Sequence, residues 1–230
     1  MINELKVIQL KFQNNVLTYL PILLTTFLIL FLHWYLGKDW HTQQIANYTS
    51  IFNAVSPLLL SINVYQAIHF EEKIGHFNHI LSKSHRHYWI SANAIYIYSI
   101  YTVCLLLSSI YVFIMSQSLT ITFIYFSSSF IFNILALICT LFLGVFVNSI
   151  FTIVLGIFLV IFNVYFGIEV LGDYSWFYIP LTYATRFVAM FLNDTLPLIT
   201  IITLNIFSLS IITSILFYSF SRWSGRSVKD

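Results

Sequence analysis

The sequence predicts an all-α membrane protein, a six-helix transmembrane bundle that occupies the whole chain. Of its 230 residues, 59% are hydrophobic and only 8% are charged, a balance that a soluble domain of this size could not keep in solution. Six apolar runs are long enough to cross a hydrocarbon core, which takes roughly 20 helical residues. Because these runs lack two-residue alternation, barrel strands are excluded. We expect a single domain over residues 1–230 with no appended catalytic domain.

The segment before the first apolar run predicts a short interfacial helix. Apolar residues between Ile2 and Phe12 are interleaved with Glu4, Lys6 and Lys11, a pattern typical of a helix lying on a membrane surface. Lysines ahead of an apolar run also begin signal peptides, but no small-residue cleavage site follows, so we expect the segment to be retained. This helix is either a simple anchor or also a contact for a cytoplasmic partner.

The six predicted spans follow the apolar runs in chain order. The turns after the third and fourth spans are tight and only reverse the chain direction. The spans cover Val16 to Leu36, Tyr48 to Ala67, Tyr88 to Met115, Leu119 to Val147, Ile150 to Val170 and Leu196 to Phe220.

The longest polar connection, Phe70 to Tyr88, predicts a cytoplasmic amphipathic helix. Ile74, Phe77, Ile80 and Leu81 recur within it at three- and four-residue spacing, which places them on one side of a helix. Such a side can dock into a partner's groove or pack against its own bundle. The pattern leaves both alternatives open.

The connection before the last span, Leu171 to Thr195, predicts an outer interfacial or re-entrant helix. Pro180 divides the segment, and the run from Leu181 to Asn193 is too short to cross a bilayer. Aromatic residues at this density are typical of the lipid headgroup region. They are Tyr174, Trp176, Phe177, Tyr178 and Tyr183.

The distribution of Lys and Arg predicts the orientation. Only Lys38 and Arg186 fall on one side of the predicted membrane, and the other eight fall on the opposite side. By the positive-inside rule, both termini and the loop from His69 to His87 are then cytoplasmic. The eight are Lys6, Lys11, Lys73, Lys83, Arg86, Arg222, Arg226 and Lys229.

One side of the second predicted span is polar but uncharged. The residues at helical spacing are Asn53, Ser56, Asn63 and Gln66, and such a stripe faces protein or water rather than lipid. It either forms interhelical hydrogen bonds or lines a path for an amphipathic substrate. Ionisable residues are nearly absent from the spans, since Glu169 alone approaches one, at its outer end. This argues against a proton-driven carrier or ion pump.

Motifs for catalysis and for nucleotide binding are missing. Neither HExxH nor GxSxG occurs, and Gly37-Lys38 is followed by Asp39 without the glycine that a phosphate loop requires. Glu71-Glu72 superficially resembles the paired glutamates of one intramembrane protease family, in which an Arg would be expected at the position of His76. We therefore expect no catalytic residue and no cofactor, and any ATP must be handled by another subunit.

No metal site or disulfide is expected either. Cys104 and Cys139 lie in apolar runs, where thiols pack as small hydrophobes. The loop is rich in histidine, but no cysteine or suitably placed carboxylate set completes a metal site, and we expect no nucleic-acid partner. The histidines are His69, His76, His79, His85 and His87.

The order of these features resembles the ABC-2 type permeases, the membrane half of ATP-binding-cassette transporters. The loop pattern is similar to one in which acidic residues, a glycine and a leucine pair precede a basic position. Before the last span, Tyr178-Ile179-Pro180 with Tyr183 and Arg186 also looks like the family's segment there. The residues that carry the loop pattern are Glu71, Glu72, Gly75, Ile80, Leu81 and Arg86.

The resemblance implies partners and a mechanism. A separate ATPase subunit would bind the N-terminal helix and the loop from Glu71 to Leu81, which includes Phe77. Its closure would move the spans as rigid bodies around a path between two identical or paralogous permeases. Glu71 and Glu72 would contact that ATPase or cap the coupling helix, or else form a helix N-terminal charge pair without a partner. The chain departs from the family at Ser84, where proline is common, and at Asn93, where lysine often begins the span.

Among these permeases, the small subunits of this length most resemble the lantibiotic immunity transporters, which expel a bacteriocin peptide from the producer's own membrane. Export of another amphipathic peptide, a lipid or a drug is the alternative within transport. An intramembrane enzyme and a membrane scaffold are the alternatives outside it. A composition rich in Ile, Asn, Phe and Tyr resembles that of a low-GC Gram-positive bacterium, so the expected location is the plasma membrane.

Overall fold

All the secondary structure that the computed structural model describes is helical. The described residues are 2–13, 15–37, 40–75, 77–82, 86–168, 176–193 and 197–225. The α-helices are α1 (Ile2–Gln13), α2 (Leu20–Leu36), α3 (Thr42–Gly75), α4 (Asn78–Leu81), α5 (His87–Ser116), α6 (Leu119–Phe146), α7 (Ser149–Phe162), α8 (Tyr183–Leu192) and α9 (Leu198–Arg222).

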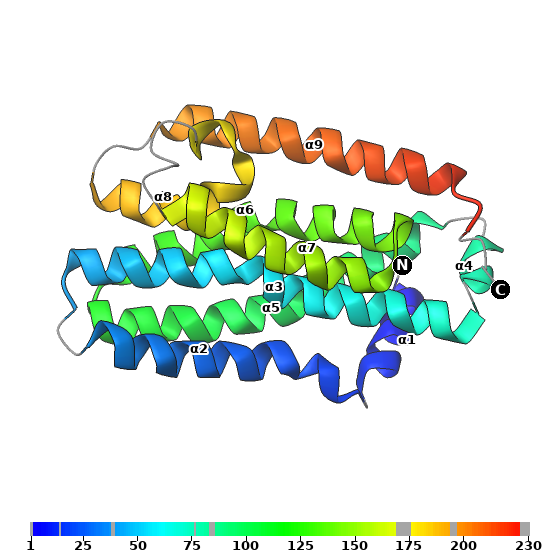
Figure 1. Ribbon diagram of the computed structural model, residues 1–230, viewed down its shortest axis with the longest axis horizontal. Coiled ribbons are helices and arrows are strands. Elements are labelled where there is room, and N and C mark those ends of the chain that lie inside the picture. The colour runs from blue at the N-terminus through cyan, green and yellow to red at the C-terminus, as the bar shows by residue number, and fades with distance from the viewer. Residues whose placement is uncertain are drawn as a thin grey trace.

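Six helical segments are long and apolar enough to cross a membrane. They are Val16–Leu36, which contains α2, then α3, α5 and α6, then Ser149–Ile168, which is α7 with the π-helix that continues it, and finally α9. The prediction of six spans is confirmed, and the chain is a multi-pass membrane protein. The helices lie roughly side by side along the long axis of the molecule (Figure 1). At one end of the bundle lie α1 and α4, which we call the α1 end, and at the other lies α8, which we call the α8 end (Figure 1).

Helix α3 is the centre of the bundle. It contacts α2, α5, α6, α7 and α8, and its apolar window is the most buried of the six, whereas that of α9 is the least. At 34 residues it is about 50 Å long, and therefore exceeds a hydrocarbon core by about 20 Å. A displacement of α3 would consequently change its contacts with five other helices.

Helix α3 is longer than the predicted second span. Sequence analysis predicts Tyr48 to Ala67, but α3 extends to Gly75 and takes up the first turns of the expected loop. The helix continues beyond its apolar run because Glu71 and Glu72 find partners on other helices. The predicted amphipathic helix is reduced to the single turn of α4.

Small residues allow α7 to approach α3 closely. A Cβ atom built on Gly156 would lie 2.1 Å from Ser61 Oγ and 3.3 Å from the Cα of Leu58. One turn earlier, Thr152 is fully buried and its hydroxyl contacts the carbonyl of Ser61 at 3.4 Å. Close backbone approach through small residues is a principal source of stability between helices in lipid.

We expect Gly156→Leu to separate α7 from α3. The added side chain has no space against Ser61 and the α3 backbone, and overpacking of this kind costs about 1–3 kcal/mol or more. Denaturation by SDS in mixed micelles measures the loss. The control is Val154→Leu on the exposed side of the same helix, which should stay within about 0.5 kcal/mol of the unchanged protein. Equal stability of the two variants would contradict the packing argument.

The α8 end is built from a compact aromatic unit. After the 3-10 turn Pro180–Thr182, α8 begins at Tyr183, so the predicted short helix within Leu181 to Asn193 is confirmed, while its position relative to the membrane stays a prediction. Tyr183 is fully buried, and its hydroxyl donates to the carbonyl of Phe177 at 2.7 Å. Burial raises the pKa of Tyr183 to about 12.

Candidate functional site

Glu71 joins three helices at the α1 end. Its carboxylate oxygen Oε1 accepts hydrogen bonds from Lys11 Nζ at 2.5 Å and from Trp89 Nε1 at 3.3 Å. The ammonium group of Lys11, in the last turn of α1, also lies 5.1 Å from the ring centre of Phe70. Glu71 is only 7% exposed, so its carboxylate is largely shielded from water, and its bonds fix α1 and α5 to the end of α3.

Glu72 joins a fourth helix to the same end. Its Oε1 accepts from the backbone N–H of Ser149 at 3.3 Å, which is the first residue of α7. A carboxylate at this position satisfies an N–H that the helix itself cannot pair, and it interacts favourably with the helix dipole. His69, one turn back on α3, lies 3.9 Å from the other carboxylate oxygen.

Three of the four apolar residues of the predicted amphipathic helix, all but Ile74, pack against their own bundle. Phe77 and Ile80 are each 1% exposed, and the ring of Phe77 lies 6.2 Å from that of Trp89 and 5.1 Å from that of Trp223. Leu81 also packs against this core. Phe77 has a left-handed backbone with φ of 65°, a conformation that a bulky residue adopts only when its surroundings hold it there.

Arg86 connects this loop to the segment that follows α9. Its Nη1 donates to the carbonyl of Trp223 at 2.8 Å. A Cβ atom on Gly225 would lie 2.7 Å from Leu81, so the segment after α9 passes directly over α4. Six of the seven predicted coupling residues, all but Gly75, therefore make contacts with other parts of the same chain. For Gly75 it describes only the backbone, as the last residue of α3, and His76 and residues 83–85 lie outside the described chain.

Two side chains on the last turn of α3 point away from the bundle. Lys73 is exposed, and Ile74 has 66% of its surface accessible. They are adjacent to the two glutamates that anchor the helix end. Lys73 and Ile74 are therefore accessible at the α1 end, whereas Phe77 and Ile80 are buried.

The polar stripe of α3 faces the interior of the bundle. Asn53 and Ser56 form hydrogen bonds with Tyr101 of α5 and Asn133 of α6, and we call this buried group the polar seam. Asn133 Nδ2 donates to Asn53 Oδ1 at 3.3 Å and to Tyr101 Oη at 2.9 Å, and Tyr101 Oη contacts Ser56 Oγ at 3.3 Å. All four are at most 3% exposed, so these predicted path residues lie in interhelical hydrogen bonds.

The seam continues toward the α8 end through a second chain of hydroxyl groups. Ser108 Oγ lies 3.0 Å from the hydroxyl of Tyr48 and 2.7 Å from that of Tyr125. These residues come from α5, α3 and α6, in that order. The predicted stripe residues nearer the α1 end have other partners, since Gln66 donates to Thr18 at 2.9 Å and Asn63 contacts its own helix at Leu59.

Asn133→Leu is expected to destabilise the bundle by about 1–2 kcal/mol. It leaves Asn53 and Tyr101 without one hydrogen-bond partner each, and interhelical bonds in membrane proteins average about 0.6 kcal/mol with a maximum near 1.7. Denaturation by SDS measures the change, and Ile134→Leu on the same helix is the control. A neutral Asn133→Leu would show that the seam adds no stability.

The outer residues named from the sequence do not form one cluster. Tyr178 is 73% exposed, and Pro180 starts the turn that leads into α8. Arg186 is 6% exposed, and its Nε donates to the carbonyl of Gly167 at 2.7 Å. Glu169 and the segment up to Ser175 lie outside the described residues.

Sequence reasoning missed several residues of these sites. Lys11 and Trp89 complete the Glu71 cluster, and Tyr101 and Asn133 complete the polar seam. A usable signal existed in the third predicted span, where Tyr101 and Ser108 are seven residues apart and therefore share one helix side. Among the described residues, no group of three or more His, Cys, Asp or Glu could hold a metal ion.

Comparison of the chain with protein-family models, with curated proteins and with solved structures finds no match. The sequence pattern and the geometry of the α1 end and the polar seam are therefore the observations that point to a function.

Proposed function

We propose that the chain is the permease subunit of an ATP-binding-cassette transporter of the ABC-2 type. In this proposal a separate subunit binds and hydrolyses ATP, a second permease subunit completes the path, and the α1 end is cytoplasmic. The cargo is an amphipathic antimicrobial peptide of the lantibiotic class, which the complex expels from the plasma membrane of the cell that makes it.

The observation that carries the proposal is the rigid construction of the α1 end. Helix α3 exceeds the bilayer core by about 20 Å, and Glu71 and Glu72 tie its last turns to α1, α5 and α7. A force applied to this end would be passed to the central helix as a rigid-body movement rather than absorbed by a loose loop.

The polar seam supports the same proposal. A buried row of hydroxyl and amide groups between α3, α5 and α6 is held by bonds of 2.7–3.3 Å, each individually modest in energy. A tilt of α3 can exchange such bonds for bonds to an amphipathic cargo or to water. An aliphatic interface would offer no comparable substitute.

Affinity purification in mild detergent from the native membrane tests the proposal. Mass spectrometry should identify a stoichiometric ATPase with the unchanged protein and lose it with Ile74→Asp. This substitution adds a charge to an exposed position and touches none of the contacts that hold the α1 end. The matched control is Tyr178→Asp, on an equally exposed aromatic residue at the α8 end, which should retain the ATPase.

Two results would contradict the proposal. Recovery of no ATPase with the unchanged protein would remove the transporter interpretation and favour the enzyme or scaffold alternatives. An ATPase that resists Ile74→Asp would remove the assignment of its contact to the end of α3. For the cargo, co-expression with the ATPase should raise tolerance to one lantibiotic in a panel, and unchanged tolerance to all of them would overturn the immunity role.

A further inference from the structure

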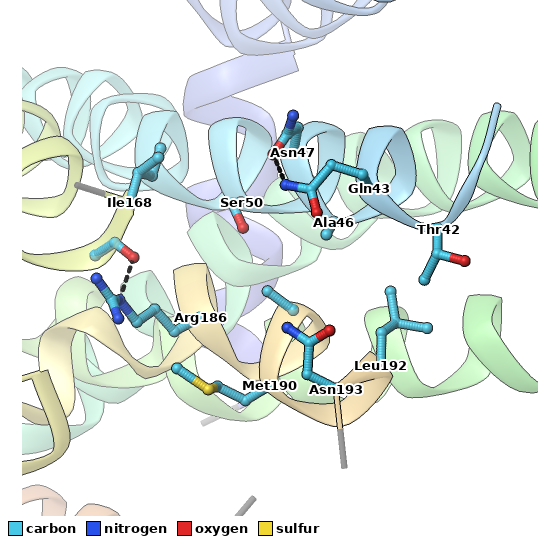
Figure 2. A pocket seen from close by; sticks show the side chains of 12 residues that line it. Thr42, Gln43, Ala46, Asn47, Ser50, Ile168, Arg186, Met190, Leu192 and Asn193 are labelled. Atoms are coloured by element: carbon cyan, nitrogen blue, oxygen red, sulfur yellow. Dashed lines mark hydrogen bonds between the residues drawn. The ribbon is translucent and has the colours of Figure 1, made fainter. Parts of the chain in front are cut away.

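A cavity of about 340 Å³ lies at the α8 end, between the first turns of α3 and helix α8. The end of the π-helix Asn163–Ile168, which continues α7, completes its wall. Figure 2 shows Gln43 and Ser50 of α3 on one side of the cavity and Arg186 and Asn193 on the other. This site is far along α3 from Glu71 and takes no part in the coupling proposed above.

A buried guanidinium group belongs to the wall of this cavity. Arg186 is 6% exposed, and its bond of 2.7 Å to the carbonyl of Gly167 fixes the side chain in place. Gly167 permits the arrangement because a Cβ atom there would lie 2.2 Å from Thr185 Oγ1. Arginine keeps its charge at any physiological pH and presents several donors in one plane, a geometry that matches phosphate oxygens.

The remaining wall suits an anionic group that carries an apolar tail. Thr42 and Gln43 contribute a hydroxyl and an amide group from the first turn of α3, where the helix dipole is positive, and Ser50 contributes a hydroxyl about two turns further along. The described residues that line the cavity include no acidic side chain, whereas Met190 and Leu192 contribute apolar surface. Because α3 is longer than the hydrocarbon core and its predicted apolar run begins only at Tyr48, we expect its first turns at the depth of the lipid headgroups.

We propose that this cavity binds the phosphodiester headgroup of a phospholipid from the leaflet at the α8 end. Arg186 supplies the positive charge, and Gln43, Ser50 and Asn193 supply hydrogen bonds to the phosphate and its glycerol. The depth of the cavity and its mixed lining favour a lipid over a soluble anion. The proposal does not depend on an ATPase partner or on a peptide cargo.

The first test compares two lipids on purified, delipidated protein by native mass spectrometry. Phosphatidylglycerol should be retained as one tightly held molecule, and diacylglycerol with the same acyl chains but no phosphate should bind at least about tenfold more weakly, the effect of losing a charge-assisted hydrogen bond. Arg186→Gln should weaken phosphatidylglycerol by a similar factor, and Arg186→Lys by less. Arg222→Gln, which removes an exposed charge on α9, should change nothing.

A second variant leaves every charge in place. Ala189→Phe adds a ring to the α8 wall and should abolish retention of the tightly held phosphatidylglycerol, whereas Thr120→Phe, at an exposed position at the start of α6, should not. If Arg186→Gln fails to fold, these two variants still test whether the cavity holds the phosphatidylglycerol. Equal retention of the two lipids, or full retention by a folded Ala189→Phe, would overturn the proposal.

Discussion

Glu71→Ala is expected to detach α1 from the bundle and to lower the free energy of unfolding by about 2–3 kcal/mol. The substitution removes the oxygen that accepts from both Lys11 and Trp89. Breaking a fully buried pair costs about 3–5 kcal/mol, but the Lys11 side chain is 26% exposed, so water recovers part of the loss. Denaturation by SDS measures the stability, and faster tryptic cleavage at Lys11 reports the release of α1.

Two controls separate this link from a general effect of charge. Lys73→Ala removes an exposed charge two residues further along α3 and should change stability by less than about 0.5 kcal/mol. The double variant Lys11→Met, Glu71→Leu should recover much of the loss, because an apolar pair of similar volume leaves no charge unpaired. If Glu71→Ala were as stable as Lys73→Ala, the three-helix junction would be refuted.

Phe77→Ala is expected to have the largest effect of any single substitution considered, about 3–4 kcal/mol. The ring is 1% exposed and lies between Trp89 and Trp223, so its removal leaves a cavity where α4, α5 and the segment after α9 meet. The emission of the two tryptophans should shift to longer wavelength as water enters. Hydrogen exchange should increase in α4 before any other described helix.

The matched control is Ile74→Ala, three residues earlier. Ile74 is 66% exposed, so truncation should leave both stability and tryptophan emission unchanged. In the proposed transporter, Ile74→Ala should weaken the ATPase complex without unfolding the permease, whereas Phe77→Ala should do both. If Phe77→Ala left the emission and the stability unchanged, the loop would not be held by its own bundle.

The six spans were predictable because hydropathy averaged over about 20 residues reports a property of each segment alone. The end of α3 was not predictable in the same way. Its last turns are polar, and they stay helical because Lys11, Trp89 and Ser149 provide partners. Those partners are 60, 18 and 77 residues away in the chain, beyond the reach of any local pattern.

The candidate sites were also predictable only in part, namely in which residues face away from lipid and not in which residues they contact. Periodicity predicted that Asn53 and Ser56 face away from lipid, and they are buried. It could not choose between hydrogen bonding and a path, because that depends on Tyr101 and Asn133 lying opposite them. The predicted amphipathic side of the loop was likewise compatible with a partner's groove or with the bundle. The positions of Trp89 and Trp223 decide that Phe77 is covered from within.

The inward polar side of α3 has a consequence for biogenesis. With a mean hydropathy of 1.4, against 2.0–2.4 for the other five spans, α3 is the span that gains least from entering lipid alone. Its hydrogen-bond partners on α5 and α6 are synthesised later. A nascent chain that stops after α3 therefore exposes amide and hydroxyl groups that nothing yet covers. Helix α3 should dwell at the insertion machinery until α5 and α6 emerge, so the bundle assembles around its central helix as a late, concerted step.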